Sequence, residues 1–407
     1  MRTLDPATLL IVVAFVQFLV GGLTFAAAFQ AGRDRTLLWV ATSIWLACLG
    51  FLMGIARERI DWFALSVIVT NSLIITGHAC LWTSLNVFRG RPVSWAGMGL
   101  GAAAWLLLSL WPAFMLHAGW RVVAYSLICL CYIGASVRAV WPQWRLNRGA
   151  ALPLLCFLVA HGGFYVYRVF TTALPGDIWP YWPDFSLVML EALFFGIGLP
   201  FGVLMMVRAR AEQNYRYAAL HDALTKLPNR RALFERGAPM LENARLNHVD
   251  VAVLMCDLDW FKAINDRFGH EAGDHVLARF AQVLRGCAGD SALPARLGGE
   301  EFTVLATSLG PLGAQALAAR IRAQLSDQAA SLPCAITVSI GIACAQQVGY
   351  NLDRLLARAD QALYAAKTSG RDCVRAWPVW VSQDARDASA AISRGGGGAA
   401  CQHPVDA

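Results

Sequence analysis

Lysine is almost absent from this sequence: the 407 residues include only Lys226, Lys262 and Lys367, and none lies in the first half. Charged residues of all kinds make up 15% of the chain, whereas a soluble domain has about 25%. Hydrophobic residues make up 57%. This composition excludes a single soluble globular domain and favours a protein with a membrane part.

The little charge that is present is unevenly distributed. Residues 1–210 contain 14 arginines, no lysine and seven acidic residues, and they carry the whole formal net charge of +7. Acidic and basic residues balance in the remainder. We therefore expect a basic, apolar part followed by a neutral part of ordinary polarity. A neutral second part without a basic stripe argues against nucleic acid as a partner.

The eleven cysteines form no CxxC pair, and no histidine lies at the spacing of a zinc site. They are scattered through apolar runs and through the second half of the chain. An odd number without regular spacing predicts free thiols that pack as small hydrophobic side chains in a reducing compartment.

Long apolar runs dominate the first half. A bilayer core of about 30 Å needs about 20 apolar residues per helix, and seven runs approach that length. We place them at Ala7–Phe29, Thr36–Ile55, Trp62–Phe88, Val93–Leu116, Trp120–Val140, Ala150–Thr171 and Phe185–Val207. The sequence thus predicts an all-α, polytopic domain of about seven helices, residues 1–207, in a lipid bilayer.

Arginine pairs follow the odd-numbered spans. These pairs are Arg33 and Arg35, Arg89 and Arg91, Arg145 and Arg148, and Arg208 and Arg210. Basic residues near span ends are retained in the cytoplasm. We therefore expect the N-terminus outside and everything after Arg210 in the cytoplasm.

A few polar side chains lie inside the predicted spans, where they need partners. They are Asn71, His78, Asn86, His161 and Glu191. His161 and Glu191 are candidates for one buried pair. Three interpretations stay open: hydrogen bonds that fix helix packing, a pocket for a ligand or for protons, and a metal or haem site formed by His78 and His161.

Residues 208–221 contain neither glycine nor proline and predict a helical linker that continues the last span. Tyr217, Leu220 and Leu224 recur at helical spacing, so they either pair with a second copy or pack on their own domain. At the other end, residues 379–407 are rich in Ala, Gly and Ser and predict a disordered tail.

Residues 222–378 alternate β-rich runs with helical stretches, which is typical of an α/β domain. The clearest strands are Val251–Cys256, Phe302–Ala306 and Ala335–Ala343, and Leu352–Thr368 is the clearest helix.

Two segments of this domain carry candidate chemistry. Asp257 and Asp259 directly follow the first strand. Carboxylates two residues apart point to the same side, and hard oxygen ligands suit Mg²⁺ bound together with phosphates. Gly298 and Gly299 suit a tight hairpin that a ligand approaches closely. The adjacent acid Glu300 would complete a two-carboxylate metal site with Asp257.

The chain resembles the GGDEF family, the diguanylate cyclases, in five segments that occur in the family's order. They are Asp222–Arg230, Asp257–Asp266, Phe268–Asp274, Gly298–Phe302 (GGEEF, an accepted form of the signature) and Ala359–Arg371. These segments lie within the domain at 222–378, and the resemblance covers about 160 residues. The resemblance implies a fold like the palm of polymerases and adenylyl cyclases. It also implies condensation of two GTP into cyclic di-GMP and pyrophosphate by a homodimer in the bacterial inner membrane, with the N-terminus periplasmic and cyclic di-GMP effectors downstream.

The resemblance also assigns roles to individual residues. Asp257, Glu300 and the carbonyl of Leu258 look like the ligands of Mg²⁺ or Mn²⁺. Glu300 and Glu301 are the catalytic candidates, and the choice between either acid and metal coordination for activating the attacking hydroxyl stays open. The implied substrate-binding residues are Phe261, Lys262, Asn265, Asp274, Gly298, Gly299, Lys367 and Arg371. Of these, Asn265 and Asp274 would read guanine.

One family feature is missing. Many members have an Arg-x-x-Asp product-binding site five residues before the two glycines, but Gly289 and Ala292 occupy those positions here and Asp290 is out of register. We therefore expect no product inhibition by that route. Two alternatives to an active cyclase are a silent GTP-binding scaffold and a transporter with an enzymatic appendage. The intact motif residues argue against the first, and the scarcity of polar residues in the spans argues against the second.

Overall fold

The computed structural model describes residues 6–56, 63–173, 185–289, 291–328 and 335–378. The chain divides into two compact units, which meet between Gln213 and Asn214. The first unit is helical and the second contains the only sheet among the described residues. This division agrees with the contrast in charge between the two halves of the sequence.

The first unit is a bundle of helices. They are α1 (Pro6–Gln30), α2 (Arg35–Ala56), α3 (Phe63–Phe88), α4 (Trp95–Ser109), α5 (Pro112–Leu116), α6 (Ala118–Leu146), α7 (Arg148–Ala173) and α8 (Phe185–Leu220). Among the described residues, six helices are long and apolar enough to cross a membrane. Many of their large apolar side chains are exposed, among them Phe15, Leu107 and Phe170, as expected for surfaces that face lipid.

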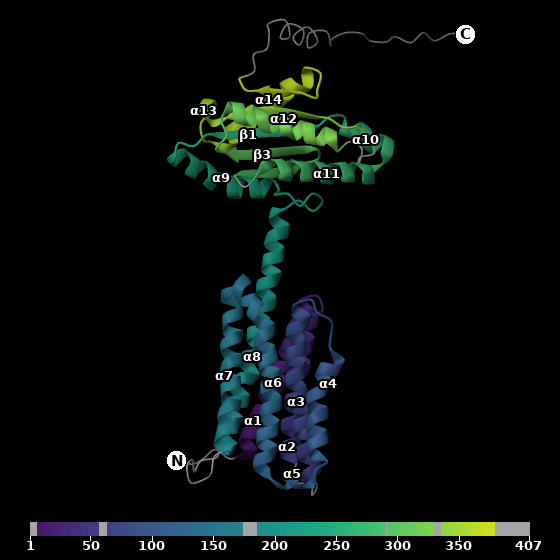
Figure 1. The fold of residues 1–407 in the computed structure, drawn as a ribbon, viewed down its shortest axis with the longest axis vertical. Helices are drawn as coiled ribbons and strands as arrows, with labels where there is room; N and C mark the ends of the chain where they lie inside the picture. Colours follow the sequence, from purple (N-terminus) through teal and green to yellow (C-terminus); the bar gives the residue numbers. More distant parts are fainter. Residues whose placement is uncertain (1–5, 57–62, 174–184, 290, 329–334, 379–407) are drawn as a thin grey trace, which may run out of the picture. The chain divides into compact units, whose positions relative to one another are not determined.

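The fourth predicted span, Val93–Leu116, is not a single helix. Pro112 begins a new helix, α5, after a break at Leu110 and Trp111. A proline suits the first position of a helix, where no backbone N–H is needed. The remaining helix α4 has 15 residues, which at about 1.5 Å per residue is shorter than the hydrocarbon core. Even so, α4 leads from the end of the bundle where α3 ends back toward α5 at the other end (Figure 1).

The last helix of the bundle, α8, has 36 residues and includes the segment 208–220, for which the sequence predicts a helix. Arg210 on this helix donates a hydrogen bond to the carbonyl of Phe88, with Nη1 and O 2.6 Å apart. Its guanidinium also stacks on the ring of Phe88. These contacts fix α8 to the end of α3.

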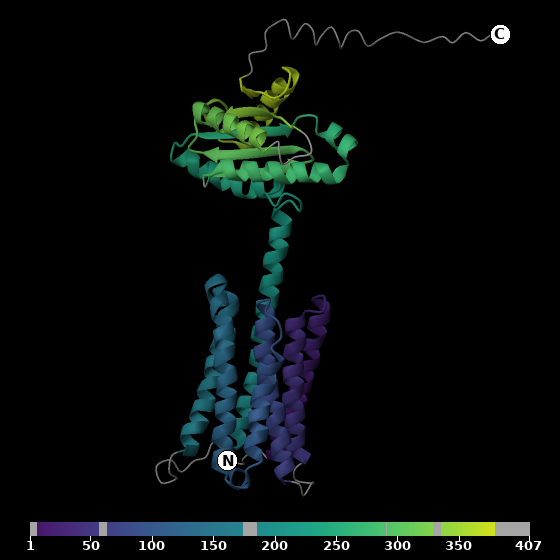
Figure 2. The same ribbon diagram turned by 45° about the vertical axis from the view of Figure 1, so that its right-hand side comes forward.

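The second unit is a five-stranded sheet covered by helices on both faces (Figure 2). Its strands are β1 (Val251–Leu258), β2 (Ala292–Gly298), β3 (Glu301–Thr307), β4 (Val338–Cys344) and β5 (Val374–Ala376), in the order β2-β3-β1-β4-β5. Its helices are α9 (Arg230–Leu246), α10 (Phe261–Phe268), α11 (His270–Ala288), α12 (Pro311–Asp327), α13 (Ala345–Val348) and α14 (Leu352–Thr368). Only β5 is parallel to its neighbour.

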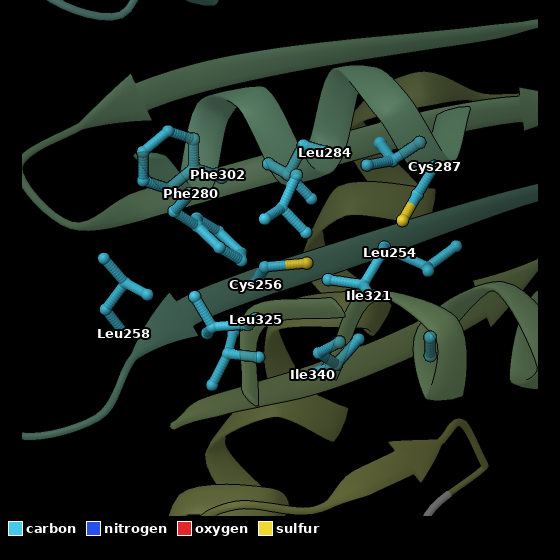
Figure 3. Packing of buried hydrophobic residues seen from close by; sticks show 14 of the residues in the cluster. Leu254, Cys256, Leu258, Phe280, Leu284, Cys287, Phe302, Ile321, Leu325 and Ile340 are labelled. Atoms are coloured by element: carbon cyan, nitrogen blue, oxygen red, sulfur yellow. The ribbon is translucent and has the colours of Figure 1, made fainter. Parts of the chain in front are cut away.

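The central strand β1 is buried along its whole length because both of its faces are covered. Its even-numbered side chains, such as Leu254 and Leu258, pack against α11 and α12, where Phe280 and Ile321 meet them (Figure 3). Its odd-numbered side chains Val251, Val253 and Met255 pack against α9 and α14. This alternation puts Asp257 on the same face as α14.

The described cysteines are all free, as the sequence predicts. Those of the second unit are buried or half-buried, and Cys256 and Cys287 belong to its main core. In the first unit Cys131 and Cys156 are exposed, so these two do not pack in a core as the sequence predicts.

We expect Gly341→Ala to destabilise the second unit by about 3 kcal/mol, the upper end of the usual cost of overpacking a core. A Cβ at Gly341 on β4 would lie 2.1 Å from the carbonyl oxygen of Ala359 and 2.2 Å from the amide nitrogen of Leu363, both backbone atoms of α14. The measurement is thermal unfolding of the full-length protein in nanodiscs, with protease cleavage within residues 214–378 as the signal that the second unit has unfolded.

Gly286→Ala on α11 is the matched control. Its Cβ would meet no atom closer than 3.9 Å, and alanine is the better helix former by about 1 kcal/mol. Equal effects of the two substitutions would contradict the close packing of α14 on β4.

Candidate functional site

The carboxyl end of β1 places an acidic side chain in the middle of the sheet. Asp257 pairs with Glu301 of β3 on one side and with Ser339 of β4 on the other, and only 4% of its surface is exposed. The side chain of Leu258 points into the core and is fully buried. Asp257 is thus held rigidly by three strands, as a functional carboxylate must be.

A tight turn between β2 and β3 brings a second acid to this position. Gly299 has φ = +51°, a left-handed conformation that favours glycine. No atom lies within 4 Å of the Cβ position of Gly298 or Gly299, so the turn leaves open space above its backbone. Because Glu301 is the register partner of Asp257, the preceding residue Glu300 lies beside the end of β1.

The two acids interact with one lysine of α14. Nζ of Lys367 lies 2.7 Å from Oδ2 of Asp257. Burial raises the pKa of Asp257, although the hydrogen bond and charge of Lys367 oppose that shift. Burial and the negative charge of Asp257 also raise the pKa of Glu300. The lysine therefore compensates the acidic pair only in part, and the site favours a further cation.

The donor set fits magnesium. Among the residues that the structure describes, no three His, Cys, Asp or Glu side chains cluster as a closed metal site. Mg²⁺ needs no such cage, since it is usually held by one or two carboxylates together with water and substrate phosphates. Asp257, Glu300 and the carbonyl of Leu258 are oxygen donors of this kind.

Basic groups lie on the same side of the sheet as the acids. Besides Lys367, Arg371 lies near enough to Asp257 to lower the pKa of that carboxyl. Its guanidinium carbon lies 4.0 Å from the centre of the Trp260 ring, which is itself 66% exposed. Lys262, in the first turn of α10, is exposed. These cations suit the phosphates of a nucleotide.

The predicted guanine-reading residues come from α10 and α11. Asn265 is half-buried on α10 beside the buried Phe261, and Asp274 is exposed on α11. A Cβ at Gly273 would lie 2.0 Å from Oδ1 of Asn265, so this glycine gives the asparagine side chain its room.

Asp259, which the sequence pairs with Asp257 as a metal ligand, has a different role. Its carboxylate accepts hydrogen bonds from the hydroxyls of Thr337 and Ser339, both at 2.7 Å, and from the amide of Asp372 at 3.0 Å. It is 3% exposed. Asp259 ties β4 and the segment after α14 to β1, and its oxygens are already used.

Arg296 is a residue whose importance the sequence did not reveal. Its Nη1 donates to Asp222 at 2.8 Å, and its Nε and Nη2 donate to the carbonyl of Gly299 at 3.0 and 2.7 Å. Burial alone would raise the pKa of Asp222, but hydrogen bonds from Thr225 and Arg296 lower this pKa below its ordinary value. One arginine thus fixes the glycine turn to the segment that follows α8. The available signal was that Asp222 begins the first of the five family segments and Arg296 lies two residues before the fourth.

Comparison with known proteins identifies the second unit. Residues 219–373 match the family described as "Diguanylate cyclase, GGDEF domain". A bifunctional diguanylate cyclase/cyclic di-GMP phosphodiesterase of Pseudomonas aeruginosa, MucR, is 30% identical over 375 residues, which cover 87% of this chain and 52% of the relative. The Escherichia coli diguanylate cyclase DgcM is 39% identical over 171 residues, which cover 41% of this chain and 40% of the relative. The chain therefore spans about half or less of the length of these curated relatives.

Among solved structures, the GGDEF domain of PA1120 from Pseudomonas aeruginosa is 37% identical, with a TM-score of 0.36, and the match covers 38% of this chain and 99% of that one. The coiled coil and GGDEF domain of DgcB from Caulobacter crescentus, solved with c-di-GMP, is 30% identical, with a TM-score of 0.40. That match covers 43% of this chain and 94% of the DgcB chain.

We expect Glu300→Gln to raise the thermal unfolding midpoint of the metal-free protein at pH 7. The pKa values of Asp257 and Glu300 are raised in the folded state, so their ionised forms cost stability at neutral pH. That cost disappears as the pH falls through the folded-state pKa values. The advantage of the variant should therefore shrink on acidification, as a series of melting curves between pH 7 and pH 4 would show.

Glu301→Gln serves as the control. Glu301 is exposed, and its charge contributes less than burial and Asp257 to the raised pKa of Glu300, so this variant should raise the midpoint at pH 7 by less than Glu300→Gln does. A lower midpoint for Glu300→Gln than for the wild type at pH 7 would contradict the proposed repulsion.

Proposed function

Because residues 219–373 form a GGDEF domain, we propose that this chain is a diguanylate cyclase that condenses two GTP molecules into cyclic di-GMP and two pyrophosphates. The observation that carries the proposal is the acidic pair Asp257 and Glu300 beside Lys367, at the open glycine turn. Charge neutralisation and positioning are what phosphoryl transfer chiefly needs.

The substrate groups follow from the placement of the side chains. Lys367, Arg371 and Lys262 hold the phosphates of GTP, and the open space over Gly298 and Gly299 receives the nucleotide. Asn265 offers both a donor and an acceptor to the guanine edge, and Asp274 accepts hydrogen bonds from its N–H groups. Phe261 supports this pocket from within the core.

The reaction joins the 3′-oxygen of one GTP to the α-phosphorus of the other, and pyrophosphate leaves. Asp257, Glu300 and the carbonyl of Leu258 would hold Mg²⁺ or Mn²⁺, which supplies charge neutralisation at the phosphates when bound. The attacking hydroxyl must lose a proton, and coordination to the cation, Glu300 or Glu301 would assist that loss. Glu301, which is exposed, is the second acid near that hydroxyl.

A product with two equivalent halves requires two domains that face each other, so the active form is a homodimer. Tyr215 and Tyr217 on α8 support this, since they are 77% and 53% exposed. Leu224, in contrast, packs against the core of its own domain. We therefore assign α8, rather than residue 224, to contact with a second copy.

The helical unit places the enzyme in the bacterial inner membrane and regulates it. The arginine pairs that follow α1 and α3, flank the junction of α6 with α7 and lie on α8 support a periplasmic N-terminus and a cytoplasmic catalytic domain, with α4 and α5 together counted as one crossing. Cyclic di-GMP made there acts on effectors in the cytoplasm.

The central test is product formation from GTP and Mg²⁺ by the full-length protein in nanodiscs. We expect the wild type to make cyclic di-GMP, and Glu300→Gln to lose at least 100-fold in turnover, because the variant loses a ligand of the divalent cation that would neutralise charge at the phosphates. GTP binding should persist in that variant, which a filter-binding assay would check. GTP binding without product in dimeric wild type would favour the silent scaffold.

Another prediction concerns the selection of GTP over ATP. Gly273→Ala should raise the KM for GTP at least tenfold and reduce discrimination against ATP, because the new methyl group displaces Oδ1 of Asn265. Gly286→Ala lies on the same helix away from the site and should leave both quantities unchanged. Unaltered kinetics in Gly273→Ala would contradict the role given to Asn265.

A separate prediction concerns inhibition by the product. Gly289 and Ala292 stand where an Arg-x-x-Asp site would have its charged residues, while Asp290 lies outside the described residues. Initial rates should therefore be the same with and without added cyclic di-GMP at micromolar concentration. Strong inhibition in that range would show that a product site exists elsewhere.

A further inference from the structure

The helical unit contains a cavity of about 400 Å³. Apolar side chains such as Ile74, Val188 and Phe195 line part of it. Charged and polar side chains line the rest: His78, Arg121, Tyr125, His161, Arg168 and Glu191. A cavity with apolar walls and a few convergent polar groups is the usual form of a small-molecule site.

The hydrogen bonds of the two histidines determine the charge on one wall. Nδ1 of His78 lies 2.9 Å from the carbonyl oxygen of Ile74, which only accepts, so this nitrogen carries a hydrogen. Nδ1 of His161 bonds the Glu191 carboxylate in the same way. The Nε2 atoms of His78 and His161 then face each other at 3.0 Å. Each of these nitrogens has a lone pair, and the two lone pairs would repel each other unless a proton lies between them. With this proton, the two histidines and Glu191 together carry no net charge.

Arg168 is left with no such balance. Its guanidinium carbon lies 5.5 and 5.8 Å from the ring centres of Tyr125 and Tyr165. Its Nε is buried without a hydrogen-bond partner, and among the described residues no carboxylate pairs with it. A second arginine, Arg121, lines the same cavity and donates to the carbonyl of Met115. The cavity therefore combines apolar walls with the guanidinium of Arg168, which no described carboxylate balances.

We propose that this cavity binds an amphipathic carboxylate of the size of a medium-chain fatty acid. The carboxylate pairs with Arg168, and the chain lies along the apolar wall. A guanidinium without a hydrogen-bonding partner is costly within a membrane-spanning bundle, and planar carboxylates match it with two parallel hydrogen bonds. The volume is at the small end of the range of about 300–1,000 Å³ for ligand pockets, so a phospholipid does not fit.

A continuous polar path connects this site to α8. The hydroxyls of Tyr125 and Tyr165 lie 3.3 Å apart, and that of Tyr165 lies 3.5 Å from Nε2 of His78. From there the path passes through His161 to Glu191 on α8. A bound carboxylate that draws Arg168 away from the tyrosines would alter this path. Regulation of cyclase activity by the ligand rests on the proposed function, whereas binding itself does not.

The test measures binding without GTP, so that its outcome is independent of cyclase activity. Full-length protein in phosphatidylcholine nanodiscs is titrated calorimetrically with sodium octanoate and with octanamide, its neutral counterpart, and empty nanodiscs are subtracted. We expect octanoate to bind at least tenfold more tightly than octanamide. Equal affinities, or no binding of octanoate, would overturn the proposal.

Variants then locate the site. Arg168→Gln should weaken octanoate binding at least tenfold, and Arg168→Lys should keep part of it. Arg138→Gln removes an exposed arginine of α6 that does not line the cavity, and it should bind as the wild type does. Unchanged binding in Arg168→Gln would contradict the assignment. If Arg168→Gln cannot be reconstituted into nanodiscs, the comparison of octanoate with octanamide on the wild type still decides whether the cavity binds a carboxylate.

Discussion

Two carboxylates that repel each other are the constraint on which the second unit depends. Asp257 is almost fully buried at the end of the central strand, and Glu300 lies beside it with a raised pKa. Lys367 compensates part of this charge. A folded protein keeps such a costly arrangement where function requires it. In the proposed function, the requirement is a place where a divalent cation and nucleotide phosphates would complete the balance of charge.

The rest of the domain keeps this pair in position. Helices on both faces of β1 bury the strand from end to end. Arg296 joins the glycine turn to Asp222, and Asp259 joins β4 and the loop after α14 to the end of β1. The close approach of α14 to Gly341 places Lys367 opposite Asp257. Each of these contacts removes a freedom of movement that would separate the charges, so the site is preorganised for a highly charged substrate.

The sequence predicts the parts of this structure that depend on local pattern. The helix Leu352–Thr368 was predicted because its apolar periodicity is strong, and the core of β1 because it is a short, continuous apolar run. Strands β2 and β5 were missed: β2 contains a proline and lies at an edge of the sheet, and β5 has three residues. The break before Pro112 divided an expected span. The pairing of His161 with Glu191 was predicted and is present. The roles of Asp259 and Arg296 depend on partners 80 and 74 residues away in the sequence, which no local pattern reveals.

The claim that most needs a direct test is that the acidic pair holds the divalent cation. Mn²⁺ is added to the full-length protein with a GTP analogue that does not react, and bound Mn²⁺ is counted by electron paramagnetic resonance. The account predicts one protein-dependent site in the wild type and in Glu301→Gln, and its loss in Asp257→Asn combined with Glu300→Gln. Undiminished Mn²⁺ binding in that double variant would contradict it.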